Sequence, residues 1–300
     1  MATDLSPGSN LESALETKRK LLEDFLDRHL PPEDREPRTL HQAMRYSVLS
    51  GGKRIRPLLT LLVAEAVGGK VEESLPVAAA FECIHAYSLI HDDLPCMDDD
   101  DLRRGRATNH KVYGEAMAVL AGDALLTFAF ELVAEGVADP RKASAVLLDM
   151  AHFAGASGMV GGQAIDIESD GAEPDPKQLE KIHRLKTQAL ITASARAGVL
   201  VVGSDDETLR CVTSYGEKVG LAFQIMDDLL DEEGTTDQLG KTAGKDRTQK
   251  KLTFPRVHGR AESRARAGTL AREAKEALHP LGTSARLLLS LADYVVERKR

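Results

Sequence analysis

The stretch FECIHAYSLIHDDLPCMDDDDLRRG, residues 81–105, joins an apolar run to a dense group of carboxylates. Its first half spaces apolar residues as a buried helix does. Pro95 then interrupts the pattern, and a proline inside a helix ends or distorts it. We therefore expect a buried helix that ends among the aspartates.

A second stretch, VGLAFQIMDDLLD at residues 219–231, has the same organisation. Asp227 and Asp231 are four positions apart, so their carboxylates share one face of a continuous helix and repel each other. Asp92 and Asp98 are six apart, but the proline between them lets them converge from a helix end. Oxygen ligands without His or Cys suit Mg²⁺, and the spacing of a calcium EF-hand is absent.

Acidic runs in arbitrary helices are more often solvated surface than metal sites. Here two such runs each follow an apolar helix, and the first is followed at once by Arg103, Arg104 and Arg106. Fixed cations beside paired carboxylates favour a site for metal ions and phosphate groups over a solvated surface.

The rest of the chain predicts an all-α protein. Only 4% of its 300 residues are aromatic and none is Trp, while helix-favouring Ala, Leu, Glu, Lys and Arg are plentiful. Helical apolar spacing recurs between Gly and Pro breakers, with no alternating strand, so we expect a bundle of roughly ten or more helices. Residues 1–10 are expected to be a disordered tail and 11–300 a single domain, in which 232–251 form a long, mobile loop.

Composition also limits partners and location. The net charge of −8 argues against nucleic acid as a partner. Cys83, Cys96 and Cys211 form no CxxC pattern and fit a reducing compartment. The N-terminus resembles neither a signal nor a transit peptide, and no stretch approaches the roughly 20 apolar residues that span a bilayer. We expect a cytoplasmic protein without membrane insertion.

The quoted motifs resemble those of the trans-prenyl-diphosphate synthases, or polyprenyl synthetases. Residues 92–105 resemble the family's first aspartate-rich motif and residues 227–231 its second. The resemblance covers nearly the whole chain, is closest to bacterial-type farnesyl diphosphate synthases, and implies a homodimer of helical bundles, each around a large central cavity. The further motifs, in the family's order, are GGKRIRP at 51–57, GGQAID at 161–166, Lys186-Thr187, Gln224 and the lysine-rich loop.

The resemblance also implies roles for particular side chains. Several magnesium ions, for which manganese can substitute, would be held by Asp92, Asp98, Asp227 and Asp231. Isopentenyl diphosphate would be bound by Lys53, Arg56, His85 and Arg104. The allylic diphosphate would be bound by Arg103, Lys186, Thr187, Gln224, Lys241 and Lys251. The catalytic set would be Asp92, Asp98, Arg103, Lys186 and Asp227.

Two of these assignments have ordinary alternatives. GGKRIRP taken alone is typical of a solvated loop, and a lone histidine such as His85 is more often a packing residue. The basic end, residues 298–300, can fold over the site in this family, but a solvated tail is an equal alternative, so these residues stay outside the predicted site.

The implied reaction is ionisation of the allylic diphosphate, attack by the double bond of isopentenyl diphosphate, and loss of a proton. The cation must be kept from water, which gives the loop at 232–251 a purpose as a lid. No residue is an obvious base, so the released diphosphate is a candidate proton acceptor.

Product length is expected to depend on the helix before Asp92. Tyr87 and Ser88 lie about one turn earlier and would form the floor of the chain tunnel. Tyr87, with the two extra residues in the first motif, resembles farnesyl (C15) synthases, whereas geranylgeranyl (C20) enzymes tend to have smaller groups there. The alternatives are a C20 product and a Tyr87 that is only a core aromatic.

Two other classes of protein share parts of this pattern. A class I terpene cyclase has one acidic motif but usually pairs it with an Asn/Ser/Glu-type second metal site, and it needs no isopentenyl diphosphate site. A non-catalytic prenyl synthase subunit is expected to lose one or both acidic motifs. Both motifs are intact here, which favours the synthase.

Overall fold

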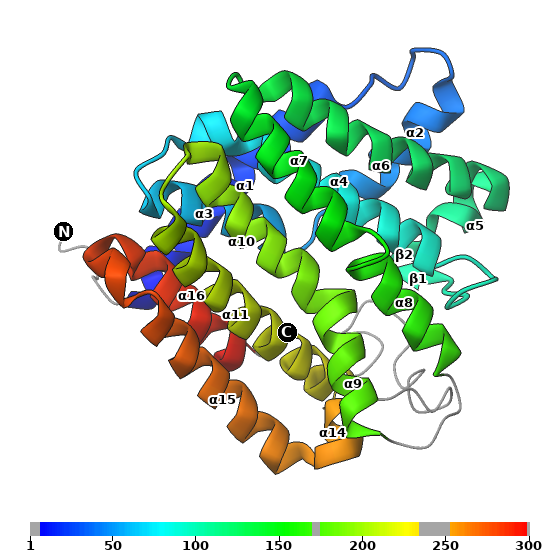
Figure 1. Cartoon of the computed structure of the whole chain (residues 1–300). Helices are drawn as coiled ribbons and strands as arrows, with labels where there is room; N and C mark the ends of the chain where they lie inside the picture. The colour runs from blue at the N-terminus through cyan, green and yellow to red at the C-terminus, as the bar shows by residue number, and fades with distance from the viewer. Residues whose placement is uncertain (1–6, 170–174, 234–252, 299–300) are drawn as a thin grey trace.

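The computed structural model describes residues 7–169, 175–233 and 253–298, and these are almost entirely helical (Figure 1). The all-α prediction is confirmed. The helices in the first half are α1 (Pro7–His29), α2 (Arg38–Val48), α3 (Ile55–Ala66), α4 (Val71–Asp92), α5 (Asn109–Tyr113), α6 (Glu115–Gly136) and α7 (Pro140–Ala154). Those in the second half are α8 (Met159–Glu168), α9 (Pro176–His183), η1 (Arg184–Gln188), α10 (Ala189–Val202), α11 (Asp206–Glu233), α14 (Phe254–His258), α15 (Arg260–Ala277), η2 (His279–Ala285) and α16 (Arg286–Glu297).

The N-terminal helix is longer than the sequence suggested. It is helical from Pro7, so residues 7–10, which we placed in the tail, belong to α1. Proline suits the start of a helix because the first N–H groups have no partner within the helix. Residues 1–6 and most of the predicted loop lie outside the described residues.

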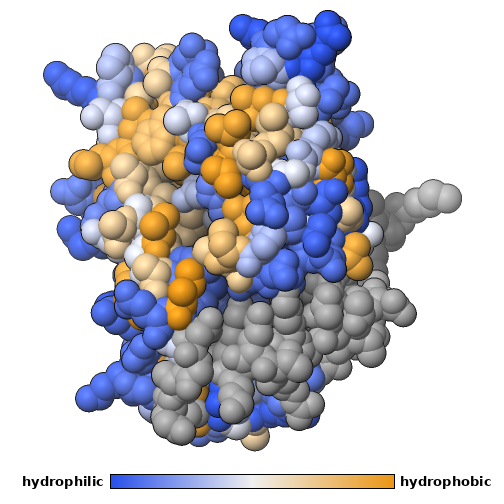
Figure 2. Space-filling view, turned by 90° about the vertical axis from the view of Figure 1, so that its right-hand side faces the viewer, coloured by the Kyte–Doolittle hydropathy of each residue, from blue (hydrophilic) through white to orange (hydrophobic). Residues whose placement is uncertain are grey.

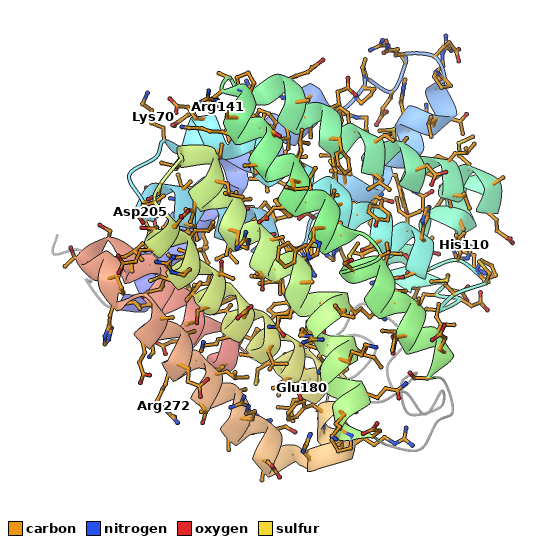
Figure 3. All side chains as sticks on the ribbon, viewed as in Figure 1. Lys70, His110, Arg141, Glu180, Asp205 and Arg272 are labelled. Carbon is orange, nitrogen blue, oxygen red and sulfur yellow. The ribbon has the colours of Figure 1, made fainter. Side chains whose placement is uncertain are left out.

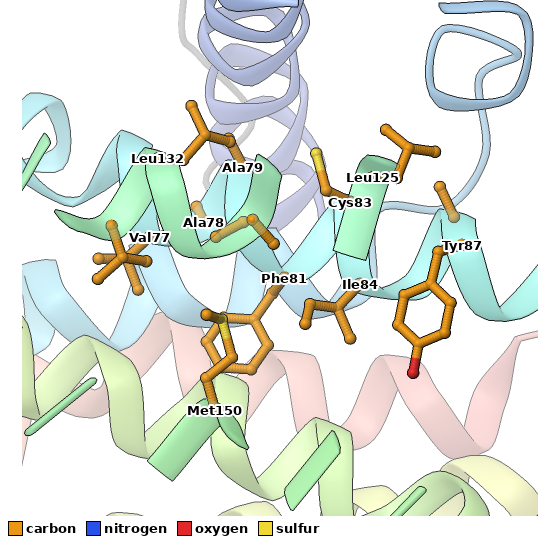
Figure 4. Packing of buried hydrophobic residues seen from close by; sticks show 14 of the residues in the cluster. Val77, Ala78, Ala79, Phe81, Cys83, Ile84, Tyr87, Leu125, Leu132 and Met150 are labelled. Carbon is orange, nitrogen blue, oxygen red and sulfur yellow. The ribbon is translucent and has the colours of Figure 1, made fainter. Parts of the chain in front are cut away.

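α4 runs through the interior, because it is apolar on nearly every side. It packs against α6, α3 and α10, and Phe81, Cys83 and Ile84 are fully buried. A helix that is hydrophobic all round belongs in a core. Figure 4 shows its side chains packed together with Leu125 and Leu132 of α6 and Met150 of α7. The first acidic motif therefore begins at the end of a buried helix, as expected.

A second core cluster holds the helix of the second acidic motif. α11 packs against α15, α10 and α16, and its buried side chains include Tyr215, Val219 and Ile225. α3 and α10 contribute to both core clusters and so hold α4 and α11 in one packed bundle. Charged side chains such as Lys70 and Arg272 project from the outside of this bundle in Figure 3.

A short hairpin corrects the expectation of no strands. β1 (Leu102–Arg103) pairs antiparallel with β2 (Arg106–Ala107). Arg104 and Gly105 form the turn and both have positive φ, 55° and 73°, as tight hairpin turns with the right twist require. The sequence shows no alternation here because each strand is only two residues long.

The expectation about apolar stretches also needs correction. Two runs, Glu115–Gly136 and Pro140–Glu168, are long and apolar enough to cross a membrane by length and composition alone. The first is α6, which packs along α4 in the core; the second is divided by the structure into α7 and α8. Core helices of globular proteins pass the same test, so this finding is weak evidence for a membrane span.

Candidate active site

The first acidic motif folds back on the end of α4. The backbone N–H of Asp98 donates to the carbonyl of Asp92 at 2.8 Å, and that of Asp100 donates to the carbonyl of Asp93 at 3.2 Å. Pro95 lies in the turn between them, where no helical hydrogen bond is needed. The break therefore brings Asp98 back beside Asp92, as the sequence predicted.

Asp92 is a carboxylate that lacks full compensation. Its pKa is raised to about 6, because the effect of burial, with a smaller contribution from the charge of Asp98, outweighs the lowering effect of Lys186 and Arg103. A carboxylate in such surroundings gains from a bound cation. This matches the role that the resemblance assigns to Asp92 and Asp98.

The second acidic motif lies on the last turns of α11, which is continuous through Asp231. Asp227 accepts a hydrogen bond at 2.7 Å from Nη2 of Arg298, and the Nζ of Lys53 lies 3.7 Å from the same oxygen, Oδ1. The Arg298 guanidinium also stacks over the Phe223 ring at 4.0 Å. Cations from two distant segments thus face the carboxylate that the sequence assigned to metal binding.

Magnesium fits these residues without a complete protein cage. Among the described residues, no three His, Cys, Asp or Glu side chains are close enough to hold one ion. Mg²⁺ commonly keeps several waters and takes only one or two carboxylates, with substrate phosphates as further ligands. The oxygen-only donors Asp92, Asp98, Asp227 and Asp231 suit that arrangement.

The cationic residues assigned to isopentenyl diphosphate come together from three segments. Arg104, on the hairpin turn, donates through Nη1 to the hydroxyl of Ser50 at 3.2 Å and to the carbonyl of Gly51. That contact brings it against the loop that carries Lys53 and leads into α3, where Arg56 lies. A Cβ on Gly52 would lie 2.6 Å from Cζ of Arg104, so glycine is needed there for this close approach.

Arg56 and Lys53 carry positive charge that the protein neutralises only in part. Burial lowers the pKa of Arg56 to about 10 and also lowers the pKa of Lys53. The Nε of Arg56 is buried and has no hydrogen-bond partner among the described residues. Donors of this kind are suited to an incoming diphosphate.

Arg54, between these two cations, has a different role that the sequence did not reveal. Its side chain is fully buried, donating from Nε to Glu23 at 2.8 Å, from Nη2 to the carbonyl of Val48 at 2.7 Å, and from Nη1 to Glu82. The loop from 51 to 54 is therefore bound through Arg54 to α1, α2 and α4. This contact turns the neighbouring Lys53 and Arg56 towards the site. GGKRIRP is thus held to the protein through Arg54, while Gly52 and Lys53 remain exposed.

His85 lies two turns before Asp92 on α4, among arginines. Burial lowers its pKa well below the ordinary value of 6.5, and the charges of Arg56, Arg104, Arg103 and Arg54 lower it further. His85 is therefore neutral at physiological pH in the absence of substrate. It would offer a hydrogen bond, not a charge, to a diphosphate.

This shift predicts a pH dependence of stability. As pH falls through 6.5, the unfolded chain takes up a proton at His85 and the folded chain does not, so stability is lost. The free energy of unfolding of wild type should fall relative to His85→Gln by about 1.4 kcal/mol per pH unit below 6.5. Urea unfolding at pH 7.5, 6.5 and 5.5 measures this, with His152→Gln on the exposed side of α7 as control. If the free energy of unfolding changed equally with pH in wild type and in His85→Gln, the folded protein would have to protonate this histidine.

Two of the residues assigned to the allylic diphosphate, Arg103 and Lys186, are held by buried or partly buried aspartates. Arg103 donates from Nε to both carboxylate oxygens of Asp93, at 2.7 and 2.9 Å. Lys186 donates from Nζ to Asp166 at 2.6 Å. Neither Asp93 nor Asp166 was predicted as a site residue, although Asp166 ends the GGQAID motif.

Lys186 and Thr187 lie in η1, a single π-helical turn that leads into α10. Such turns occur mostly inside α-helices and often at functional sites. α8 approaches this turn closely, because a Cβ on Gly162 would lie 2.3 Å from the backbone nitrogen of Lys186. Gly162 therefore has a physical function: it lets α8 pack directly on the turn that carries Lys186.

The remaining predicted residues fall in three places. Gln224 lies on α11, one turn before Asp227, and donates to Asp228. Tyr87 is buried on α4, and Ser88 donates to the carbonyl of His85 in its own helix at 2.9 Å. Lys241 and Lys251 lie outside the described residues.

One surface hollow is unrelated to the acidic motifs. It has a volume of about 340 Å³ and lies beside the first half of α11, between Arg196 and Glu217. The carboxylates of the second motif are on the last turns of that helix. We therefore assign it no part in the site.

Comparisons with known proteins agree with this geometry. Residues 37–279 match the family model described as polyprenyl synthetase. Over 291 residues the chain is 46% identical to the chloroplastic heterodimeric geranylgeranyl pyrophosphate synthase large subunit 1 of Arabidopsis thaliana, covering 94% of this chain and 78% of that protein.

Solved structures of similar proteins have the same fold. An FPP/GFPP synthase of Zymomonas mobilis superposes with a TM-score of 0.86 at 37% identity, covering 96% of this chain and 99% of that one. A geranyltransferase of Helicobacter pylori, complexed with magnesium and isoprenyl diphosphate, superposes with a TM-score of 0.85 at 33% identity, covering 99% of this chain and 97% of that one.

The fold, the family match and the two acidic motifs define a prenyltransferase. The chain belongs to the polyprenyl synthetase family and is a trans-prenyl diphosphate synthase.

Proposed function

We propose that this synthase condenses isopentenyl diphosphate with dimethylallyl and geranyl diphosphate and stops at farnesyl diphosphate, the C15 product. The observation that carries the proposal is the place of Tyr87. It lies five residues before Asp92 on α4, about 7.5 Å along the helix axis. Beyond it the core is filled, because Phe81, Ile84 and Met150 are all fully buried. A chain that grows from the acidic motif along α4 would meet the Tyr87 ring, which Figure 4 shows next to Ile84 and Phe81 of the same helix.

The substrates would be held by the residues already placed. Asp92, Asp98, Asp227 and Asp231 would hold magnesium, which neutralises the allylic diphosphate and eases its departure. Lys53, Arg56, Arg104 and neutral His85 would bind isopentenyl diphosphate. Lys53 also lies beside Asp227, so the two substrate sites adjoin there.

Charge on the leaving group would be stabilised chiefly by Arg103 and Lys186. Both cations are held by aspartates and cannot swing freely. A preorganised cation stabilises charge that develops in the transition state without the cost of reorganisation. The released diphosphate is the proposed acceptor of the proton that the condensation product loses.

The proposal is tested by incubating the pure protein with Mg²⁺, isopentenyl diphosphate and one allylic diphosphate at a time. Elongation of dimethylallyl and geranyl diphosphate to C15, with farnesyl diphosphate left unextended, is the expected result. Elongation of farnesyl diphosphate to C20 would overturn the product assignment. A cyclic hydrocarbon from a single substrate, or no elongation with any primer, would overturn the synthase mechanism itself.

A C20 product is the second candidate, and a specific observation favours it. The 46% identical Arabidopsis relative is named a geranylgeranyl pyrophosphate synthase subunit. The Zymomonas mobilis structure is of an FPP/GFPP synthase, so similar folds occur with more than one product. The two candidates differ in whether farnesyl diphosphate is a substrate or the end product.

Replacing Tyr87 by Ala should lengthen the product. The change removes the ring between the reaction site and the filled core, and so leaves room for at least one more five-carbon unit. The main product should shift from C15 to C20 or longer, as measured by chromatography of the dephosphorylated alcohols. Tyr87→Phe keeps the ring and should keep the C15 product. An unchanged product from Tyr87→Ala would show that the ring is core packing alone.

We also propose that the protein acts in the cytoplasm as a homodimer. Exposed apolar side chains lie on α5 and α6, with Val112 46%, Val119 40% and Leu120 52% exposed. Figure 2 shows apolar side chains gathered on the face that carries these helices. Large exposed apolar patches commonly mark protein interfaces.

The dimer is tested by sedimentation velocity. Wild type should sediment as a dimer, and Leu120→Glu should shift it towards monomer because a charge cannot be buried unpaired in an apolar contact. Arg272→Glu, an exposed change on α15, is the control and should remain dimeric. A monomeric wild type would contradict this proposal.

A further inference from the structure

The hairpin that carries Arg103 and Arg104 needs support from the rest of the protein. Each of its strands is only two residues long, and a two-stranded ribbon is marginally stable on its own. Arg104 also has a φ of 55°, a conformation that costs energy for a residue other than glycine. Contacts from outside the hairpin must therefore hold the Arg104 guanidinium in place.

Thr108 closes the base of the hairpin. Its backbone N–H donates to the carbonyl of Asp101 at 3.0 Å, and its hydroxyl donates to the carbonyl of Asp100 at 2.7 Å. Thr108 is only 2% exposed. The chain that enters the hairpin is thus joined to the chain that leaves it, so a shift of residues 107–109 would move the whole hairpin.

Asn109, the first residue of α5, binds the end of the hairpin to α2. It is 2% exposed, and its Nδ2 donates to the carbonyl of Ala43 and to the hydroxyl of Ser47, both at 2.8 Å. An amide nitrogen has two hydrogens, and both are used here. Asn109 therefore fixes the start of α5 at one point along α2.

Tyr46, on the same part of α2, holds the second strand of the hairpin. Its hydroxyl donates to the carbonyl of Ala107 at 2.7 Å. The Arg106 guanidinium stacks over the Tyr46 ring, with Cζ 4.3 Å from the ring centroid, and the Tyr113 ring packs edge-on against it. Tyr46 therefore contacts both residues of β2.

The loop that follows α2 contacts the tip of the same hairpin. There Arg104 donates to the hydroxyl of Ser50 and to the carbonyl of Gly51. Residues 43–51 thus hold the hairpin from its base to its tip. Arg103, by contrast, is held by Asp93 at the end of α4, so its position depends less on α2.

We propose that Tyr46 and Asn109 are positioning residues for isopentenyl diphosphate. Through the hairpin they hold the Arg104 guanidinium where it binds that substrate, and neither side chain touches the substrate itself. This inference rests on the proposed function, which assigns Arg104 to isopentenyl diphosphate and Arg103 to the allylic diphosphate. Because Arg103 has its own support, loosening the contacts with α2 should weaken the binding of isopentenyl diphosphate selectively.

The first test is steady-state kinetics with each substrate varied while the other is saturating. Tyr46→Phe removes the hydroxyl contact and keeps the ring, and Asn109→Ala removes both amide contacts. Each should raise the KM for isopentenyl diphosphate about two- to tenfold, with kcat and the KM for geranyl diphosphate close to those of wild type. Equal rises in the two KM values would show a general loss of structure and would overturn the proposal.

Tyr294→Phe is the matched control. It makes the same chemical change on α16, which lies outside the hairpin and its supports. Both KM values of this variant should equal those of wild type. A rise in the KM for isopentenyl diphosphate as large as that of Tyr46→Phe would contradict a specific role for Tyr46.

The second test asks whether Tyr46 acts through Arg104. Arg104→Gln should itself raise the KM for isopentenyl diphosphate. Tyr46→Phe/Arg104→Gln should show no further rise, because no guanidinium is left to position. A further rise equal to that of Tyr46→Phe alone would show that Tyr46 acts independently of Arg104, and would overturn the proposal.

The outcomes separate this inference from the proposed function. Failure of wild type to elongate any primer, or an unchanged KM for isopentenyl diphosphate in Arg104→Gln, would reject the proposed function or its assignment of Arg104. A raised KM in Arg104→Gln with unchanged values in Tyr46→Phe and Asn109→Ala would reject this inference alone. If Asn109→Ala does not fold, Tyr46→Phe decides the matter, because it keeps the ring contacts with Arg106 and Tyr113.

Discussion

Replacing Asp227 by Asn should lower kcat about a thousandfold, because the variant loses a carboxylate that faces both Lys53 and Arg298. The amide cannot neutralise a metal ion, and the two cations then repel each other across the site. The Mg²⁺ concentration for half-maximal rate should rise together with the fall in kcat. Steady-state assays over a series of Mg²⁺ concentrations measure both effects.

Asp101→Asn is the matched control for this loss. Asp101 lies in the first acidic run, its side chain is 71% exposed, and it pairs with Lys111 at 2.7 Å. Its replacement should leave kcat and the Mg²⁺ dependence close to those of wild type. Equal losses for the two variants would mean that activity depends on overall negative charge and not on the position of Asp227.

Arg54→Met should have the largest effect on stability. The side chains of Arg54 and Glu82 are 0% and 2% exposed, so removing the arginine leaves a carboxylate buried without its cation. Breaking a buried pair in this way costs about 3–5 kcal/mol of the free energy of unfolding. Urea unfolding at pH 7.5 measures the loss.

The double variant Arg54→Met/Glu82→Leu tests the stated cause. Replacing both charges by apolar groups removes the buried, unpaired carboxylate, so the double variant should be more stable than Arg54→Met alone. The exposed Lys70–Glu73 pair on the surface provides a control, and Lys70→Ala should have no measurable effect. If the double variant is less stable than Arg54→Met, the unpaired Glu82 is not the cause of the lost stability. The loss in Arg54→Met then comes from the contacts of the arginine with Glu23 and with the carbonyl of Val48.

The local parts of the site were predictable from the sequence. Asp227 and Asp231 share a face because helix periodicity is a property of the local chain, and Asp98 returns to Asp92 because Pro95 stops the helix. Sequence patterns of this range depend on neighbours a few residues away. The same reasoning placed His85 two turns from Asp92.

The contact between Asp93 and Arg103 and the role of Arg54 were not predictable in this way. Asp93 and Asp92 have the same chemistry and are adjacent, yet only Asp93 turns into the protein to meet Arg103. The partners of Arg54 include Glu82, 28 residues away, and the carbonyl of Val48. Nothing in GGKRIRP distinguishes its middle cation from the two on either side.

The basic C-terminus shows the same limit. A solvated tail and a contact with the site were equal alternatives in sequence, but Arg298 is only 7% exposed and binds Asp227 from 71 positions away. Such pairs depend on how α11 and α16 pack together. Their packing depends on the whole of the second core cluster.

By itself, the sequence determined that the chain is helical, where the carboxylates and cations of the two motifs lie along it, and that their chemistry suits diphosphates with magnesium. Helix periodicity and residue chemistry act over short range, so these properties can be read from the chain. Only the tertiary structure decided that Asp93 pairs with Arg103, that Arg54 supports the loop, and that Tyr87 lies against a filled core. Those outcomes depend on burial, which makes an unpaired charge costly and so selects one partner from residues far apart in the chain.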